Sequence, residues 1–120
     1  MNMHTKSVLV VEDEPLIRML AADFLADAGY ETMSASNADE AVRILETRGV
    51  DAVFSDIDMP GSMNGLTLAN SIARRWPNIG VLLASGKDSP VGRPASAKAG
   101  FLRKPYSQRD VVEALRRLAA

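Results

Sequence analysis

The sequence predicts an α/β domain in which helices cover both faces of a parallel sheet. Short apolar runs alternate along the chain with longer segments in which apolar residues recur every three or four positions. Gly, Pro, Asn or Ser stands at most changes between the two patterns. Right-handed crossovers return each helix to the sheet, so five βα units should form a doubly wound (βα)5 fold. A chain of 120 residues suits one domain, residues 1–120, with no room for a second.

The strands are predicted from short apolar runs rich in β-branched residues. We expect them at residues 7–12, 30–35, 51–56, 79–84 and 101–103. The first and third are nearly continuous apolar runs, which is typical of strands buried on both faces. The second alternates only weakly, and the fifth is short.

The helices are expected at 14–28, 38–48, 66–75 and 95–99, with a last helix from residue 107. Pro15 suits a first helical turn, and Gly29 ends that helix. Asn37 with Glu40, and Ser107 with Asp110, resemble capping boxes. The apolar positions at helical spacing are Leu16, Ile17, Leu20, Ala21, Phe24, Leu25 and Ala28 in the first helix, Ala41, Val42 and Leu45 in the second, and Val111, Val112, Leu115 and Leu118 in the last. Pro90 and Pro94 restrict the fourth helix to one or two turns.

Composition excludes several classes of function. Fourteen Lys and Arg against fifteen Asp and Glu give a net charge of −1, so bulk attraction to nucleic acid or to anionic membranes is not expected. The chain has no cysteine, which excludes thiol catalysis, Cys-ligated zinc and disulfides. No apolar stretch approaches 18 residues, and we expect a cytoplasmic protein without membrane insertion.

Four acidic residues follow two of the predicted strands. Glu12 and Asp13 come after the first, and Asp56 and Asp58 end or follow the third. Ligands of open α/β sheets bind beyond the carboxyl ends of the strands, so both pairs should face one crevice. Two carboxylates about 4 Å apart repel each other by roughly 4 kcal/mol at an effective dielectric constant near 20. The cluster therefore calls for a cation, and oxygen ligands favour Mg²⁺.

Five features in order resemble a response-regulator receiver domain of the stand-alone type. They are Glu12 with Asp13, the run from Asp56 to Gly61, Ser85, Phe101, and Lys104 with Pro105, and the resemblance spans about residues 6–119. It implies a flavodoxin-like fold with strand order 2-1-3-4-5, a two-component phosphorelay function and no output domain. It also implies a signalling domain rather than a turnover enzyme, limited to its own phosphorylation and slow dephosphorylation.

The crevice residues can be given individual roles. Asp56 ends the third, central strand and is best placed to attack a phosphoryl group, and the resemblance implies the same role. Mg²⁺ would be held by Asp13, Asp56 and the backbone carbonyl of Asp58, with Glu12 acting through water. Lys104 and Ser85 would contact phosphoryl oxygens, and without phosphate Lys104 should pair with Asp56. By resemblance, Ser85 and Phe101 are the switch residues.

The resemblance also implies partners, and the sequence departs from the family pattern after Ser85. The phosphodonor would be a histidine kinase or a histidine phosphotransfer protein, the downstream protein is unknown, and we expect a monomer or weak dimer without direct nucleic-acid binding. The 19-residue step from Ser85 to Lys104 is short for the family, so the output face should differ. Asp58 and Lys87 should tune the lifetime of the phosphoryl group.

Three alternative interpretations disagree with the residues present. The Asp56-x-Asp58 pattern resembles that of haloacid-dehalogenase-like phosphatases, but Pro60 and the late position in the chain disagree with that motif. A flavodoxin-like flavin binder needs a Ser, Thr and Gly-rich loop after the first strand, where Glu12, Asp13 and Glu14 would instead repel a phosphate. A degenerate receiver would lack a required group, and none is lacking here.

Overall fold

The structure, a computed structural model of the chain, describes residues 5–59, 64–86 and 98–119. Five parallel strands form one sheet: β1 (Ser7–Val11), β2 (Glu31–Ala35), β3 (Ala52–Asp56), β4 (Gly80–Ser85) and β5 (Ala99–Arg103). Their order is β2-β1-β3-β4-β5, which confirms the expected order and makes β3 the central strand. The described helices are α1 (Pro15–Asp27), α2 (Ala38–Thr47), α3 (Gly65–Arg75) and α4 (Gln108–Ala119).

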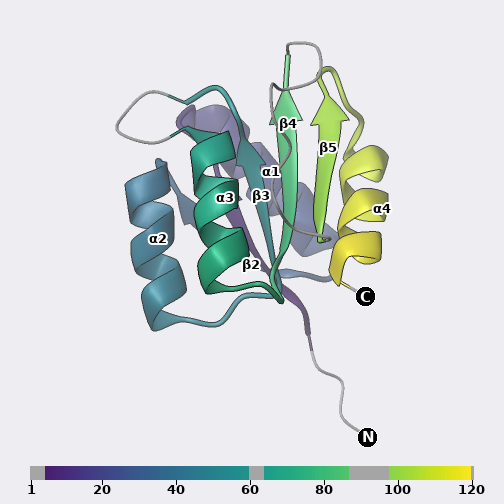
Figure 1. Cartoon of the computed structure of the whole chain (residues 1–120). Coiled ribbons are helices and arrows are strands. Elements are labelled where there is room, and N and C mark those ends of the chain that lie inside the picture. Colours follow the sequence, from purple (N-terminus) through teal and green to yellow (C-terminus); the bar gives the residue numbers. More distant parts are fainter. Residues whose placement is uncertain (1–4, 60–63, 87–97, 120) are drawn as a thin grey trace, which may run out of the picture.

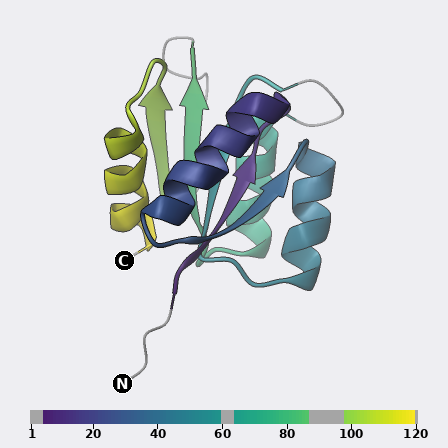
Figure 2. The same cartoon turned by 180° about the vertical axis from the view of Figure 1, so that it is seen from behind.

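The helices form a layer on each side of the sheet. α2 and α3 lie in front of it in Figure 1, and α1 and α4 cover the opposite face, seen in Figure 2. Successive strand residues point to opposite faces, so Val8 and Val10 pack under α1 and α4, whereas Leu9 and Val11 pack under α2 and α3. Each fully buried Val or Leu contributes about 1.5–3 kcal/mol. Two apolar layers therefore hold the strand ends in place.

The Ser107–Asp110 capping box forms as predicted, and the Asn37 cap forms with its return bond shifted to Ser36. The Asn37 side chain accepts the Glu40 N–H at 2.8 Å, and the Glu40 carboxylate accepts the N–H of Ser36 at 2.7 Å. Ser107 Oγ accepts the Asp110 N–H at 3.0 Å, and Asp110 accepts the Ser107 N–H at 3.1 Å. These bonds satisfy amide groups that have no partner inside the helix. Gly29, with a φ of 100°, lies just beyond the end of α1 as expected.

The prediction of a helix over 95–99 is wrong at its end. Ala99 is the first residue of β5 and pairs with Val81, whose N–H donates to the carbonyl of Lys98 at 2.8 Å. Strand pairing therefore outweighs the helical preference of alanine here. Residues 95–97 lie outside the described residues, as do Pro90, Pro94 and Lys87. Other boundaries differ from prediction by a residue or two, and Ser85 belongs to β4 rather than to the following loop.

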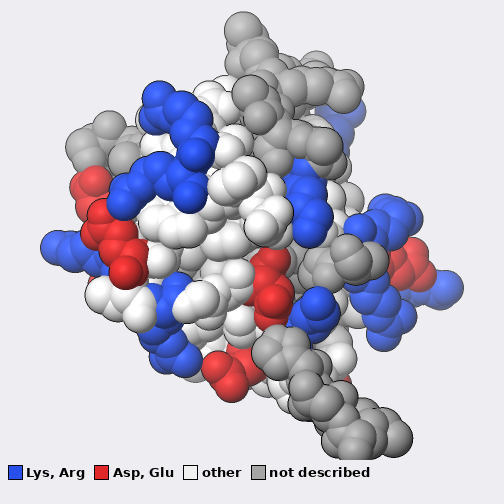
Figure 3. Space-filling view, turned by 60° about the horizontal axis from the view of Figure 1, so that its bottom comes forward, with Lys and Arg blue, Asp and Glu red and all other residues white. Residues whose placement is uncertain are grey.

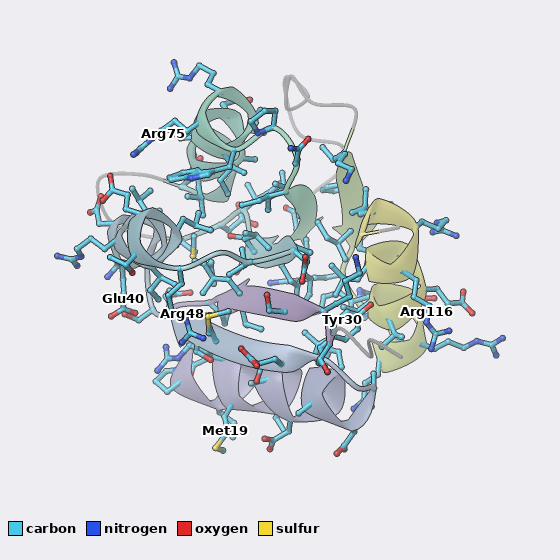
Figure 4. All side chains as sticks on the ribbon, turned by 90° about the horizontal axis from the view of Figure 1, so that it is seen from below. Met19, Tyr30, Glu40, Arg48, Arg75 and Arg116 are labelled. Carbon is cyan, nitrogen blue, oxygen red and sulfur yellow. The ribbon has the colours of Figure 1, made fainter. Side chains whose placement is uncertain are left out.

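Helix α1 exposes much of its apolar surface. Only Ala21 and Leu25 are buried. Four large side chains are exposed by 41 to 58%, namely Leu16, Ile17, Met19 and Leu20. Met19 points away from the sheet in Figure 4. The helical spacing thus identified the element, but it did not identify which apolar residues the rest of the domain covers.

The surface at the edge of the sheet where the strands begin has mixed charge. In Figure 3, the basic and acidic side chains of the described residues are interspersed around an uncharged area. Among the residues that the structure describes, no helix is long and apolar enough to cross a bilayer.

Candidate functional site

The predicted site residues meet at the edge where the strands end, marked by the arrowheads in Figure 1. Glu12 directly follows β1, Asp56 ends β3, Ser85 ends β4, and Lys104 directly follows β5. Parallel pairing sets these strand ends level, with Val11 beside Ser55 and Asp56 beside Ala84. The register of the sheet therefore brings together residues that are far apart in the sequence.

Three carboxylates form the acidic cluster. Oxygen atoms of Glu12, Asp13 and Asp56 all lie within 4.8 Å of one another. Adjacent ligand oxygens of an octahedral Mg²⁺ are about 3 Å apart, so the carboxylates would have to move closer together around a bound ion or reach it partly through water. The Asp56 side chain is only 9% exposed and Asp13 is exposed, which leaves the cluster open on one side for further ligands. The set fits a hard divalent cation held by carboxylates and water.

Burial and the neighbouring carboxylates make the charged form of Glu12 unfavourable. Glu12 is 6% exposed, and one of its oxygens accepts the N–H of Glu14 at 3.0 Å. Burial raises the pKa of Glu12 to about 7, and the Asp13 and Asp56 carboxylates add to the rise, against the lowering effects of the Glu14 N–H and Lys104. A bound cation would favour the charged form instead.

Lys104 supplies the positive charge of the site. Its Nζ lies 3.2 Å from Asp56 Oδ1, which confirms the expected pair. Burial acts to lower the pKa of Lys104, but attraction to Asp56 and to Glu12 outweighs it and raises that pKa. The lysine backbone is fixed as well, because its N–H donates to the Ser85 carbonyl at 2.8 Å.

The backbone around Asp56 is held from several directions. The N–H of Asp58 donates to Asp56 Oδ1 at 3.2 Å, and the N–H of Ile57 donates to the Ala84 carbonyl at 2.9 Å. Helix α3 begins against this turn at Gly65, where an added Cβ would overlap the backbone carbonyl of Asp56. Glycine is required there by close approach rather than by its φ angle.

Ser85 is buried, with 3% exposure, and its hydroxyl donates to Asp58 Oδ2 at 3.0 Å. Asp58, which accepts this bond, is exposed to solvent. The hydroxyl of the predicted switch serine is therefore directed to a carboxylate two residues beyond Asp56.

A family model for the response regulator receiver domain matches residues 8–116. The chain belongs to this family. Receiver domains are the phosphoacceptor domains of two-component signalling, they interact with histidine kinases or phosphotransfer proteins, and they bind Mg²⁺ at an acidic cluster. Glu12, Asp13 and Asp56 provide such a cluster in this receiver domain.

Similar proteins include both short and long chains. The chemotaxis protein CheY of Thermotoga maritima is 35% identical over 118 residues, a match that covers 95% of this chain and 98% of that protein. The sensor kinase CckA of Brucella abortus is 37% identical over 117 residues, which cover 93% of this chain and 12% of the kinase. The transcriptional regulatory protein BaeR of Escherichia coli is 32% identical, with 91% of this chain and 46% of that protein covered. This receiver domain thus spans less than half of several relatives.

Solved structures share the fold. The response regulator TrrA of Thermotoga maritima, in complex with Mg²⁺ and BeF, has a TM-score of 0.85 and 30% identity, over 95% of this chain and 99% of that one. The chemotaxis protein CheY4 of Vibrio cholerae has a TM-score of 0.86 and 27% identity, over 96% and 99%. These similarities agree with the flavodoxin-like fold expected from the sequence.

Two aromatic residues of the receiver domain lie outside the set of carboxylates. Phe101 lies on β5, half-buried against the core under α2 and α3, and its role as a switch stays a prediction.

Tyr106 was missed by sequence reasoning. It lines a small cavity of about 10 Å³ together with Glu12, Asp56 and Lys104, and its ring meets Phe54 edge-on at 5.7 Å. Burial is the main cause that raises the pKa of Tyr106. Its position two residues after Lys104 was the available signal.

Proposed function

We propose that Asp56 is the phosphoacceptor of this receiver domain and that it takes a phosphoryl group from a phosphohistidine. A carboxylate oxygen of Asp56 forms the new P–O bond while the P–N bond of the donor breaks, and the histidine nitrogen keeps the electron pair. The product is an acyl phosphate. One observation carries the proposal: the Asp56 carboxylate ends the central strand, 3.2 Å from Lys104 and within 4.8 Å of two further carboxylates.

The neighbouring residues would divide the remaining work. Asp13, Asp56 and the backbone carbonyl of Asp58 would hold Mg²⁺, with Glu12 reaching it through water. When bound, the ion neutralises charge on the phosphoryl oxygens. Lys104 would pass from the Asp56 carboxylate to a phosphoryl oxygen, and Ser85 would donate its hydroxyl to another.

We place the phosphodonor against α1. This helix starts three residues after Glu12, and Leu16, Met19 and Leu20 lie on one side of it at spacings of three and four residues. Asp23 and Asp27 continue that side and are also exposed. An apolar patch beside a reaction site marks a protein-binding surface. A partner with an apolar face and nearby basic residues, on a histidine kinase or a phosphotransfer protein, fits it.

The phosphorylated form would then present a changed surface to a downstream protein. Movement of Ser85, at the end of β4, and of Phe101, in the middle of β5, would alter the exposed part of β5 and α4. A partner that prefers one form shifts the balance between the two forms by that preference alone. We propose a signalling role without steady turnover of phosphate esters. A cytoplasmic location is supported by the lack of cysteine in the sequence, which suits a reducing compartment.

Mass spectrometry tests the assignment of Asp56. Incubation with acetyl phosphate and Mg²⁺ should add about 80 Da, the mass of one PO₃H group. The Asp56→Asn variant should show no addition, whereas Asp27→Asn, which removes an exposed aspartate at the end of α1, should react like the parent. Equal phosphorylation of Asp56→Asn and the parent would refute the assignment. Many turnovers of a generic phosphate ester per molecule would instead support the phosphatase alternative.

A further inference from the structure

Four residues of the site are connected in a closed ring of contacts. Lys104 Nζ lies 3.2 Å from Asp56 Oδ1, and the same oxygen accepts the N–H of Asp58 at 3.2 Å. Asp58 Oδ2 accepts the Ser85 hydroxyl at 3.0 Å, and the Ser85 carbonyl accepts the N–H of Lys104 at 2.8 Å. Asp58 is therefore the link between the proposed phosphoacceptor and Ser85.

The Ser85–Asp58 bond competes with the proposed role of Ser85. A serine hydroxyl has a single proton and can donate it to one acceptor at a time. In this structure the acceptor is a carboxylate, and hydrogen bonds to charged acceptors are stronger than neutral ones. Ser85 is buried, so bulk water has little access to its hydroxyl. A phosphoryl oxygen must therefore replace Asp58 as the acceptor of the hydrogen bond from Ser85.

We propose that the Asp58 carboxylate restrains Ser85 in the unphosphorylated conformation, so that Asp58 opposes activation through Ser85. This regulatory role rests on the proposed function of Asp56. It differs from the predicted metal contact of Asp58, which uses the backbone carbonyl and survives any change of the side chain. Asp58 acts here as a positioning residue, because it holds the serine and takes no part in phosphoryl transfer.

A double-mutant cycle separates this restraint from simple charge repulsion. Removal of the Asp58 carboxylate also removes a negative charge near the phosphoryl group, which would strengthen binding of any anion whether or not Ser85 is present. The restraint, in contrast, needs the hydroxyl. The coupling between Asp58→Ala and Ser85→Ala isolates the part that passes through the Ser85–Asp58 bond.

The measurement is the affinity of the protein for beryllofluoride in saturating Mg²⁺, a phosphoryl mimic that forms no acyl phosphate. With Ser85 present, we expect Asp58→Ala to tighten binding by about tenfold. In the Ser85→Ala background, the same substitution should tighten it by about twofold or less. Glu31→Ala, the loss of an exposed carboxylate at the start of β2, should change neither. Magnesium titration of each variant without beryllofluoride accounts for any change in metal affinity.

A second readout compares the variants without metal or mimic against the parent in its free and beryllofluoride-bound forms. In the unmodified protein, Asp58→Ala should move the NMR resonances of Ser85 part of the way toward their positions in the beryllofluoride-bound parent, and Asp58→Asn, whose neutral amide oxygen still accepts a hydrogen bond, should move them less. Equal tightening by Asp58→Ala in both backgrounds, or unmoved Ser85 resonances, would overturn the restraint while leaving Asp56 as phosphoacceptor. A parent that binds no beryllofluoride and gains no phosphoryl mass would overturn both proposals.

Discussion

The stability of the metal-free protein should fall as the pH rises through neutrality, because of Glu12. Burial beside Asp13 and Asp56 raises the pKa of this carboxyl from 4.5 to about 7 in the folded state. Folding therefore favours the protonated form. The stabilisation is fully present below about pH 4.5, declines as the pH rises, and is lost above about pH 7.

The expected loss of unfolding free energy follows from the size of the rise in the pKa of Glu12. Each tenfold change in proton affinity corresponds to about 1.4 kcal/mol, so a rise from 4.5 to about 7 corresponds to about 3 kcal/mol of unfolding free energy between pH 4 and pH 8. The low exposure of Glu12, 6%, means that solvent screens little of this effect. The raised pKa of Lys104 acts only at alkaline pH and leaves this window unaffected.

Urea unfolding in EDTA, followed by circular dichroism at pH 5, 6, 7 and 8, measures the effect. The Glu12→Gln variant keeps the shape of the protonated side chain and cannot titrate. We expect it to exceed the stability of the parent by less than about 1 kcal/mol at pH 5 and by up to about 3 kcal/mol at pH 8. A stability difference between parent and variant that is the same at every pH would refute this account of Glu12.

Three further predictions concern the same edge of the sheet. Asp13→Ala should weaken Mg²⁺ binding by at least about tenfold in calorimetric titration. The urea midpoint of the metal-free protein should stay unchanged or rise, because one like charge is removed, and a clearly lower midpoint would contradict this. Gly65→Ala should lower the unfolding free energy by about 2 kcal/mol, since its Cβ overlaps the Asp56 carbonyl, whereas Gly49→Ala, with nothing within 4 Å, should lower it far less. Leu20→Asp should slow phosphorylation by a cognate phosphohistidine protein at least about tenfold but leave the reaction with acetyl phosphate unchanged. Equal slowing of both reactions would argue against the α1 docking surface.

Much of the fold could be predicted because local patterns and tertiary packing agree. The apolar runs that became β1 and β3 are buried on both faces, and the Asn37 and Ser107 caps formed as expected. The segment that ends at Ala99 was misassigned because alanine has no strong strand preference of its own and only the pairing with Val81 decides its state.

The site was predictable at the level of residue types and strand ends. Asp56, Asp13 and Lys104 lie close together as expected, because parallel pairing makes strand ends neighbours. The bond from Ser85 to Asp58 was not predicted, since it depends on side-chain directions that no sequence spacing encodes. The position of Tyr106 beside the cavity likewise follows from the turn after β5 and not from any periodic pattern.

The central place of β3 has a consequence for how a chemical event on it can be felt elsewhere. Hydrogen-bonded on both sides and covered on both faces, this strand belongs to the part of the domain whose amides should exchange with deuterium most slowly. The Asp56 carboxylate at its end is therefore attached to a rigid part of the backbone. Any shape change must then be carried outward by other elements of the domain, while the strand that receives the charge stays still.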